Sequence, residues 1–403
     1  MSGVERVTGF MRTRAERNGI SDLGFALGVL LVESVAIITL SALSGSIFHL
    51  LSYGDPGSLR SYLAIGMLAA FCYAVPGLYS NEYLIQGFLA RGRRPGRVLV
   101  LWNTTFLFLA MVAFLTKSTD AVSRGWVVLF YLSGLVALGT LNSAFWILAA
   151  NSWMHTPQGA AFVDGRFVPE DWWAIVFNPS FPYRLAHMVL ASYLSVSFVV
   201  AGTSAWYLLR FRHEEIARRG FSLAMAAAAV LAPLQIFAGD LHGIQVRETQ
   251  PIKVAAMEAH WTTGRGIPFV IFAIPDEKAE RNRFEISIPY AGSLILTHRL
   301  DGEVKGLKEA KPQDRPPVFV VFVTFRLMVG IGFLLFAVAM LGLWLRWRKR
   351  LYASRLLLRL AVACVPLGFV AVIAGWMTAE VGRQPWTVYG LLRTADSVSP
   401  VPA

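Results

Sequence analysis

A cation and a carboxylate close together in a helical segment are the first candidates for chemistry in this sequence. Lys253 and Glu258 lie five positions apart in QPIKVAAMEAHW, a stretch of helix-forming residues, so both side chains could face one pocket. A carboxylate and a cation placed in this way can accept a proton from a substrate and hold one of its oxygen atoms. The alternative interpretation is an ion pair in contact with water.

Another acidic group lies at the end of a long apolar stretch. Glu380 stands in TAEVGRQPW, close to Arg383 and Gln384. An unpaired carboxylate inside a membrane costs about 2.5–3.5 kcal/mol, so we expect a cationic or metal partner. Trp376, one helical turn earlier, would lie on the same side of the helix, either against a bound group or as an ordinary interfacial tryptophan.

A histidine and a methionine in apolar stretches are candidate iron ligands. His187 lies in LAHMVLASY, and Met328 is one of 11 methionines. Haem iron accepts an imidazole and a thioether as an axial pair, in a closed centre suited to electron transfer. From the residues alone, packing is the better interpretation of both side chains.

These residues are carried by a chain that is too apolar for an ordinary soluble domain of its length. Of 403 residues, 55% are hydrophobic and 15% charged, and the mean hydropathy is +0.53. About eight stretches approach the roughly 20 apolar residues that cross a bilayer. They fall at residues 23–47, 62–78, 98–115, 126–150, 185–209, 221–237, 318–345 and 356–377. The sequence therefore predicts an all-α integral membrane protein with one long hydrophilic loop, 240–317.

The charge and the cysteines exclude several other classes of protein. The net charge is +12, but the arginines cluster between apolar spans, which indicates membrane topology and contact with lipid rather than nucleic-acid binding. Cys72 and Cys364 lie within apolar stretches and have no nearby partner in the sequence, so neither a disulfide framework nor a zinc site is predicted.

The positive-inside rule makes two demands that eight spans cannot satisfy together. The basic N-terminus and the loop at 91–97 favour the cytoplasm, whereas the basic loops near 210–219 and 346–350 place loop 240–317 outside. Either one apolar stretch does not cross the membrane, or two unrelated pieces are joined. We expect a join at about Thr140, inside the stretch 126–150.

The segment before this join has short loops and few buried polar groups. The sequences GLYSNEYLIQGFLARGRR (77–94) and LWNTTFLFLAMVAFLTKSTDAVSRGWVVLFYLSGLVAL (101–138) resemble the membrane anchor of the undecaprenyl-phosphate (polyprenyl-phosphate) sugar transferases of exopolysaccharide synthesis. Residues 1–140 would then form a four-helix anchor. The catalytic domain that follows the anchor in that family has no counterpart in this sequence.

The segment after the join resembles subunit I of cytochrome bd quinol oxidase. The resemblance is carried by LNSAFWILAANSWMHTPQG (141–159), GDLHGIQVRETQPIKVAAMEAHW (239–261), FRLMVGIGF (325–333) and AEVGRQPWTVYGLLRTADSVSP (379–400). It implies a haem and quinol domain at 141–403 in a bacterial inner (plasma) membrane. The substrate would be ubiquinol or menaquinol, and the smaller subunit II a possible partner.

The resemblance assigns roles to individual residues. It implies that His187 and Met328 are the ligands of a low-spin haem b and that Arg326 offsets a haem carboxylate in low dielectric. It also assigns quinol binding to Lys253 and Glu258.

At the end of the last span, the resemblance makes Glu380 a ligand of a high-spin haem b, with Arg383, Gln384 and Trp376 beside it. The haem d site of that family draws on a histidine of the first span, and the surroundings of His49 in GSIFHLL do not match its motif. The chain also ends where the family has one further span. We therefore expect electron transfer from quinol to haem b without a completed haem d site, and the alternative is an anchor remnant fused to a non-catalytic haem or quinone-binding module.

Overall fold

The computed structural model describes residues 26–50, 57–80, 95–115 and 124–397, except positions 32, 164 and 213, together with positions 53, 55 and 83. The basic N-terminus and most of the loop at 91–97 therefore lie outside the described residues. The chain divides into two compact units, Met1–Ile147 and Leu148–Ala403, and each is described by itself.

The first unit contains apolar helices whose aromatic side chains form its core. Its helices are Ala26–Leu50, α2 (Leu59–Tyr79), α4 (Pro95–Leu115) and the first part of α5 (Arg124–His155). The buried core of this unit contains Ile37, Tyr62, Ala69, Ala70, Tyr73, Trp102, Trp126 and Phe130. Helix α5 runs without interruption through Thr140, so the predicted join would lie within one helix.

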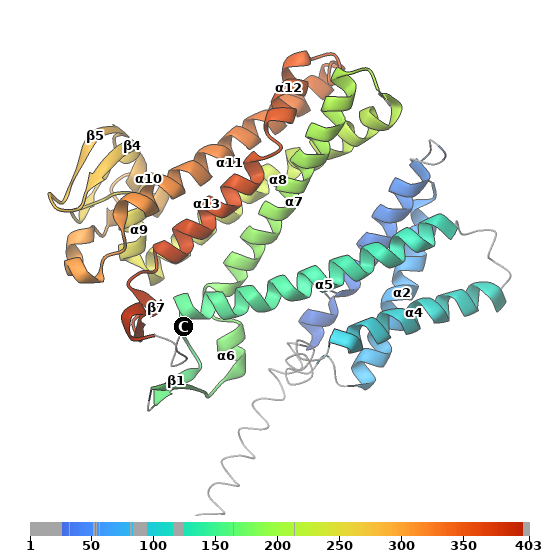
Figure 1. The fold of residues 1–403 in the computed structure, drawn as a ribbon, viewed down its shortest axis with the longest axis horizontal. Coiled ribbons are helices and arrows are strands. Elements are labelled where there is room, and N and C mark those ends of the chain that lie inside the picture. Colours follow the sequence, from blue (N-terminus) through green and yellow to red (C-terminus); the bar gives the residue numbers. More distant parts are fainter. Residues whose placement is uncertain are drawn as a thin grey trace, which may run out of the picture. The chain divides into compact units, whose positions relative to one another are not determined.

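The second unit is a bundle of long helices (Figure 1). Its main helices are α7 (Phe181–Leu209), α8 (Glu214–Thr249), α11 (Val318–Trp347), α12 (Arg355–Ala363) and α13 (Leu367–Val381). Helix α7 packs on α8, α8 on α11, α11 on α13, and α13 on α7. This order closes a bundle in which α7 and α11 are diagonally opposed.

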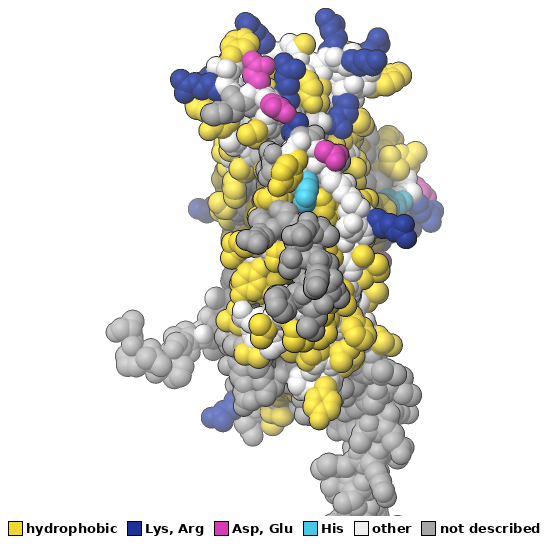
Figure 2. Space-filling model, turned by 90° about the vertical axis from the view of Figure 1, so that its right-hand side faces the viewer, with side chains coloured by type: hydrophobic (Ala, Val, Ile, Leu, Met, Phe, Trp, Pro, Cys, Tyr) yellow, Lys and Arg dark blue, Asp and Glu magenta, His cyan; other side chains and the backbone are white. Residues whose placement is uncertain are grey.

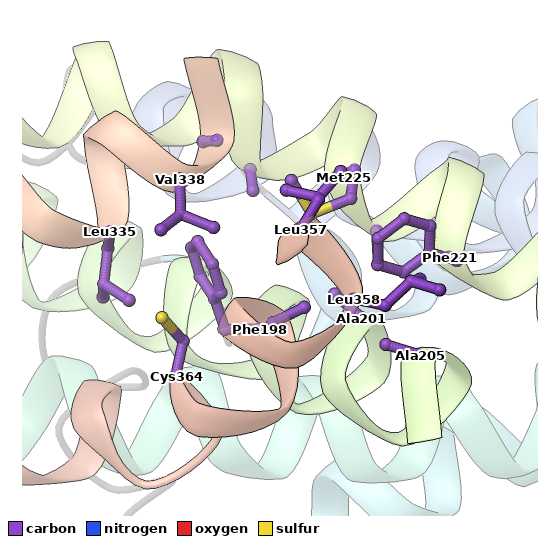
Figure 3. Close-up of a cluster of buried hydrophobic side chains, with 14 of the residues drawn as sticks. Phe198, Ala201, Ala205, Phe221, Met225, Leu335, Val338, Leu357, Leu358 and Cys364 are labelled. Atoms are coloured by element: carbon purple, nitrogen blue, oxygen red, sulfur yellow. The ribbon is translucent and has the colours of Figure 1, made fainter. Parts of the chain in front are cut away.

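Small residues let the helices of this bundle approach closely (Figure 3). A Cβ atom on Gly202 of α7 would lie 2.7 Å from the carbonyl oxygen of Ala361, and one on Gly342 of α11 would lie 2.3 Å from Met225. The buried cluster includes Phe198, Ala201, Ala205, Phe221, Met225, Leu335, Val338, Leu357, Leu358 and Cys364. Cys364 is a free thiol in this core, so here it is a packing residue.

The predicted apolar stretches correspond to helices. Within the described residues, seven helices are long and apolar enough to cross a membrane. The eighth predicted stretch is α4, whose apolar part in the described residues, Val98–Val112, is shorter. The prediction of a multi-span helical membrane protein is confirmed.

The hydrophilic segment predicted at 240–317 begins on a helix, because α8 continues to Thr249. Its helical elements are α9 (Pro251–Met257), α10 (Ala291–Thr297), η2 (Leu307–Glu309) and η3 (Pro312–Asp314). Its strands form two antiparallel pairs, β3 (Gly264–Arg265) with β6 (Glu303–Val304) and β4 (Phe269–Asp276) with β5 (Arg281–Ile288). The predicted hydrophilic loop is therefore a folded connection between α8 and α11.

Two short hairpins and two short helices complete the second unit. They are the β1–β2 hairpin (Ala160–Val163, Arg166–Pro169), α6 (Trp172–Val176), the β7–β8 hairpin (Trp386–Val388, Leu392–Arg393) and η4 (Thr394–Asp396). The backbone amide of Tyr389 donates to the carbonyl of Met154 (2.9 Å), which ties the β7–β8 turn to the last turn of α5.

The two ends of the bundle differ in charge. The α7–α8 turn and the α11–α12 turn lie at the same end (Figure 1). Lys and Arg side chains gather at this end in Figure 2. The turns contribute Arg210, Arg212, Arg346, Arg348, Lys349 and Arg350. The opposite end carries α9 and the β4–β5 hairpin.

Candidate functional site

His187 lies on α7 and faces α8. Its Nε2 atom is 3.1 Å from the amide nitrogen of Gln235, and its ring lies 5.7 Å from the ring of His242. Within the described part of the chain, neither the buried His187 Nδ1 nor the buried Gln235 Oε1 has a hydrogen-bond partner. A Cβ atom on Gly239 would lie 3.3 Å from the His187 ring, so glycine keeps this side of the ring open.

Met328 lies on α11, the helix diagonally opposed to α7. Its sulfur faces α13, where a Cβ atom on Gly375 would lie only 2.8 Å from Sδ. His187 and Met328 thus project from opposed helices. His187 lies beside Gly239 of α8, and Met328 lies beside Gly375 of α13. A planar group between these helices could be approached by one side chain on each face.

Lys253 is buried where α9 packs against α13. Its ammonium group donates to the carbonyl of Ala379 (2.9 Å), and only 4% of the residue is exposed. Burial lowers the pKa of Lys253 well below its usual value, and Arg184 acts in the same direction. Glu380 opposes this shift in pKa.

Glu380 is the centre of a polar network that joins four helices, α5, α7, α9 and α13. Its Oε1 accepts from the Asn151 amide (2.8 Å), and its Oε2 accepts from Arg383 (2.7 Å). The His155 Nε2 lies 3.6 Å from Oε1. Arg184 donates to the Asn151 side-chain oxygen. We call Asn151, His155, Arg184, Lys253, Glu380 and Arg383 the Glu380 network.

The Glu380 network meets the expectation that this carboxylate has a cationic partner. Among the residues that the structure describes in it, Arg184, Lys253 and Arg383 are three basic side chains against one carboxylate. Arg184 and Arg383 are 7% and 8% exposed. An excess of buried positive charge is costly unless an anionic group compensates it.

A set of uncharged side chains fixes the helix ends around this network. Thr156 donates to Asn178 (3.1 Å) and Ser180 (3.0 Å), and Gln245 also donates to Ser180 (3.1 Å). Gln250 donates to the last carbonyl of α5 (2.6 Å). These contacts hold the ends of α5 and α8 against the start of α7, which positions the network.

Glu258 forms a separate buried ion pair. Its Oε2 accepts from Arg326 Nη2 (2.6 Å), and the two side chains are 4% and 12% exposed. Arg326 Nε donates to the Val270 carbonyl (2.6 Å), and its guanidinium lies 4.4 Å from the Phe269 ring centre and 4.9 Å from that of Phe322. Nη1 is buried without a partner among the described residues.

The structure therefore separates the two residues that the sequence placed together. Lys253 contacts α13 and Glu258 contacts α11, because positions five apart project from different sides of a short helix. The family resemblance predicted that Arg326 offsets a haem carboxylate. In the structure, its Nη2 and Nε donate hydrogen bonds to other protein groups, and its Nη1 remains for another acceptor.

The other predicted residues take different positions. Arg383 belongs to the Glu380 network and also donates to the Thr387 carbonyl (2.7 Å). Gln384 accepts from Thr394 (2.8 Å) and so faces the β7–β8 hairpin. Trp376 is partly buried on α13, one turn before Glu380.

Sequence reasoning missed several residues of this site. The sequence did not single out three members of the Glu380 network, Asn151, His155 and Arg184. It also did not single out His242, whose ring lies beside that of His187. A signal was present, because polar side chains within the ANSWMHTPQG motif must find partners when the segment is helical and surrounded by apolar residues.

His49 in the first unit lies among aromatic rings. Its Nδ1 is 3.2 Å from the Gly45 carbonyl oxygen. The ring centres of Phe48, Tyr53 and Tyr62 lie 5.5, 5.4 and 5.4 Å away. This environment favours the structural interpretation of His49 over iron ligation.

Comparison with known proteins identifies the family. A family model described as cytochrome bd terminal oxidase subunit I matches residues 104–403. The chain belongs to this family. It is 37% identical over 276 residues to the cytochrome bd ubiquinol oxidase subunit 1 of Bacillus subtilis, covering 66% of the chain and 59% of that relative. It is 31% identical over 367 residues to the cytochrome bd-II ubiquinol oxidase subunit 1 of Escherichia coli, covering 72% and 71%.

The bd oxidase likeness also extends to a solved structure. The bd oxidase of Geobacillus thermodenitrificans matches with a TM-score of 0.64 at 28% identity, covering 93% of this chain and 88% of that one. The chain spans 59% of the length of the Bacillus subtilis relative. The relatives are bacterial membrane proteins, so the predicted multi-pass membrane location is confirmed.

These matches bear on the predicted boundary at residue 140. The family match begins at residue 104, within the segment predicted to be a sugar-transferase anchor, and the two compact units divide after Ile147. The bd oxidase likeness therefore reaches into the first unit. The transferase resemblance, and the division at 140, stay predictions.

The side chains around His187, Met328 and Glu380 in this chain are suited to binding haem. His187 Nδ1 and Gln235 Oε1 are buried polar atoms without partners among the described residues, and glycines adjoin both His187 and Met328. The Glu380 network has buried cations that suit the carboxylates of a haem. These features fit haem at His187 and Met328 and at Glu380.

Proposed function

We propose that this chain oxidises quinol at α9 and passes the electrons to a low-spin haem b held by His187 and Met328. The observation that carries the proposal is the buried Glu258–Arg326 ion pair. Arg326 stands two positions before Met328 on α11, so one rigid helix joins the acidic group on α9 to the haem ligand.

The chemistry at α9 follows from these groups. A quinol that is oxidised to a quinone gives up two electrons and two protons, and it would do so in two steps of one electron and one proton each, with Glu258 releasing the first proton to water before it accepts the second. The Glu258 carboxylate can accept a proton from the phenolic hydroxyl, and the resulting weaker contact frees Arg326 Nη2 to hold the ring oxygen. Lys253, buried at the other side of α9, is a further donor. A haem b bound by His187 and Met328 would supply the one-electron acceptor.

A second haem at Glu380 extends this proposal. Glu380 would be a ligand of a high-spin haem b, with Arg184 and Arg383 holding its carboxylates and Trp376 beside it. Dioxygen reduction at a haem d is outside the proposal, because the environment of His49 is that of a packed aromatic cluster. A smaller subunit II is the partner that the family relationship suggests.

The orientation of the bundle agrees with a quinol site outside the cytoplasm. The α7–α8 and α11–α12 turns are basic, which favours the cytoplasmic side for that end. Helix α9 lies at the opposite end (Figure 1). Ubiquinol or menaquinol would then be oxidised at the outer face of a bacterial inner membrane.

The first experiment tests the haem ligands. A reduced-minus-oxidised spectrum of the purified protein should show a b-type band, and Met328→Leu or His187→Leu should abolish its low-spin component. Met340→Leu, also on α11 but packed against the buried cluster, should leave the band unchanged. An unchanged band in Met328→Leu and His187→Leu would contradict the assignment.

The second experiment separates quinol oxidation from mere haem or quinone binding. In Glu258→Gln, dithionite should still reduce the haem, while reduction by a quinol should slow by an order of magnitude or more, about 10²–10⁴-fold for loss of a proton acceptor. Equal rates with and without Glu258 would favour the non-catalytic module. Sugar-phosphate transfer to a polyprenyl acceptor should be undetectable, and its detection would favour the anchor remnant.

A further inference from the structure

Large apolar side chains are exposed on the β4–β5 hairpin, although it belongs to the hydrophilic segment. Phe272 is 52% exposed, Phe284 77%, Ile286 60% and Ile288 49%. Phe284 has a left-handed backbone (φ 52°), which is costly for a bulky residue. Apolar side chains gathered on one surface usually mark a contact with a partner or a membrane.

The hairpin lies beside α11, not beyond its end. At the turn, Glu277 Oε1 accepts from the backbone amide of Val318, the first residue of α11 (2.8 Å). Further along the hairpin, the Val270 carbonyl accepts from Arg326 (2.6 Å). Eight positions separate Val318 from Arg326, a rise of about 12 Å along a helix. The hairpin therefore contacts α11 at its first residue and again through a side chain that starts two turns further on.

Helix α11 faces outward with apolar residues over this same interval. The outward side chains are Phe319, Val323 and Leu327, which are 48%, 40% and 46% exposed. The sequence from 318 to 325, VFVVFVTF, has no charged residue. Because this helix is a membrane span, these side chains face lipid, and the hairpin lies at the same depth.

Charge and apolarity are graded along the hairpin in the direction that a membrane requires. The turn end carries the Asp276–Arg283 ion pair and Glu280, which pairs with Arg315 (2.6 Å). The exposed Ile286 and Ile288 lie toward the open end, and the exposed Glu285 beside Ile286 accepts from Asn282 (2.8 Å). A segment that enters an interface from the aqueous side has its charges outermost and its apolar side chains deepest.

The other side of the hydrophilic segment has a different character. There, α10 is tied to α8 by Arg247, which donates to the Leu296 carbonyl (2.6 Å), and by the His298–Asp240 contact (3.2 Å). Arg299 nearby is exposed and charged. The α8 side therefore carries exposed charged groups together with the exposed apolar Leu294, Ile295 and Leu300, whereas α11 has no charged residue from 318 to 325.

We propose that the β4–β5 hairpin is immersed in the lipid of the outer membrane interface along α11, while Arg299 on the α8 side of the same segment stays in water. The occupant of the apolar surface is lipid. Lipid accounts for both the depth of the hairpin beside a span and the direction of its charge gradient. This immersion does not depend on the activity of the protein.

The consequence for the site rests on the proposed function. Val270 of the immersed hairpin and Glu258 of α9 both bind Arg326. A quinol dissolved in lipid would then reach the Glu258–Arg326 pair along the hairpin without passing through water.

The test places an environment-sensitive fluorophore on the two sides of the segment. Phe284→Cys and, separately, Ile286→Cys and Arg299→Cys are made in a Cys72→Ser background, labelled with a nitrobenzoxadiazole dye and reconstituted as the full complex in lipid nanodiscs. Buried Cys364 stays unlabelled in a folded protein, and this verifies folding of each variant.

The two sides should respond to opposite quenchers. Nitroxide lipid labelled high on its acyl chain should quench the dye at 284 and 286 several-fold more than at 299, and aqueous iodide should show the reverse. Equal quenching by iodide at 284 and 299 would overturn the proposal in favour of a solvated hairpin. Protection of 284 and 286 from both quenchers would overturn it in favour of a protein partner. Neither readout requires haem or quinol, so failure here and failure of quinol oxidation are distinguishable.

Discussion

The second unit contains two groups of buried charge that differ in their balance. Glu258 and Arg326 form a pair of one carboxylate and one guanidinium with little exposure. In the Glu380 network, the described residues include three basic side chains and one carboxylate. The pair is electrically complete within the protein, whereas the network has positive charge left over. The difference teaches that the network has buried positive charge available to an anionic group, whereas the charges of the pair compensate each other.

The largest effect on stability is expected from breaking the pair. Glu258→Gln leaves the Arg326 charge buried and uncompensated, which should lower the free energy of unfolding by about 3–5 kcal/mol. The measurement is thermal unfolding followed by a thiol-reactive dye, which reaches Cys364 only after the core opens, in a Cys72→Ser background.

The double variant sharpens this result. Arg326→Gln added to Glu258→Gln removes both charges and should recover much of the loss, because two neutral amides can hydrogen-bond in place of the ions. A strictly additive loss in the double variant would show that the two residues do not act as a pair.

A smaller loss is expected at Glu380. A third of its side chain is exposed, so Glu380→Gln should cost less than Glu258→Gln, about 2–3 kcal/mol after allowance for solvent screening. Arg383→Met added to this variant lowers the excess of positive charge and should restore part of the stability. If the added substitution instead deepens the loss, repulsion among the basic residues is not what destabilises Glu380→Gln.

The smallest of the three effects is expected at Asn151, which bridges Arg184 and Glu380. Asn151→Ala removes two hydrogen bonds but no charge and should cost about 1–2 kcal/mol, by the same unfolding measurement. The matched reference is Glu214→Gln at the basic end, whose exposed pair with Arg218 contributes about 0.3–0.5 kcal/mol. Equal losses in the two variants would mean that the bridge adds no more than a surface ion pair.

The spans could be predicted from the sequence, but the contacts of the charged residues could not. Hydropathy over about 20 residues is a local property, and α11 and α7 formed where apolar stretches were long enough. His187 and Met328 could be singled out only through the family resemblance, because their types and spacing fit packing as well. The exposed apolar side chains of the β4–β5 hairpin could not be predicted, because they lie in a segment that is hydrophilic on average.

The sequence by itself determined that the chain is a helical membrane protein with acidic and basic residues near the ends of its spans. Only the tertiary structure decided which of these charges meet. Asn151 and Glu380 are 229 positions apart, and Glu258 and Arg326 are 68 apart. The physical reason is that a span forms from neighbouring residues, whereas an ion pair inside a bundle forms where the packing of distant helices brings two side chains together.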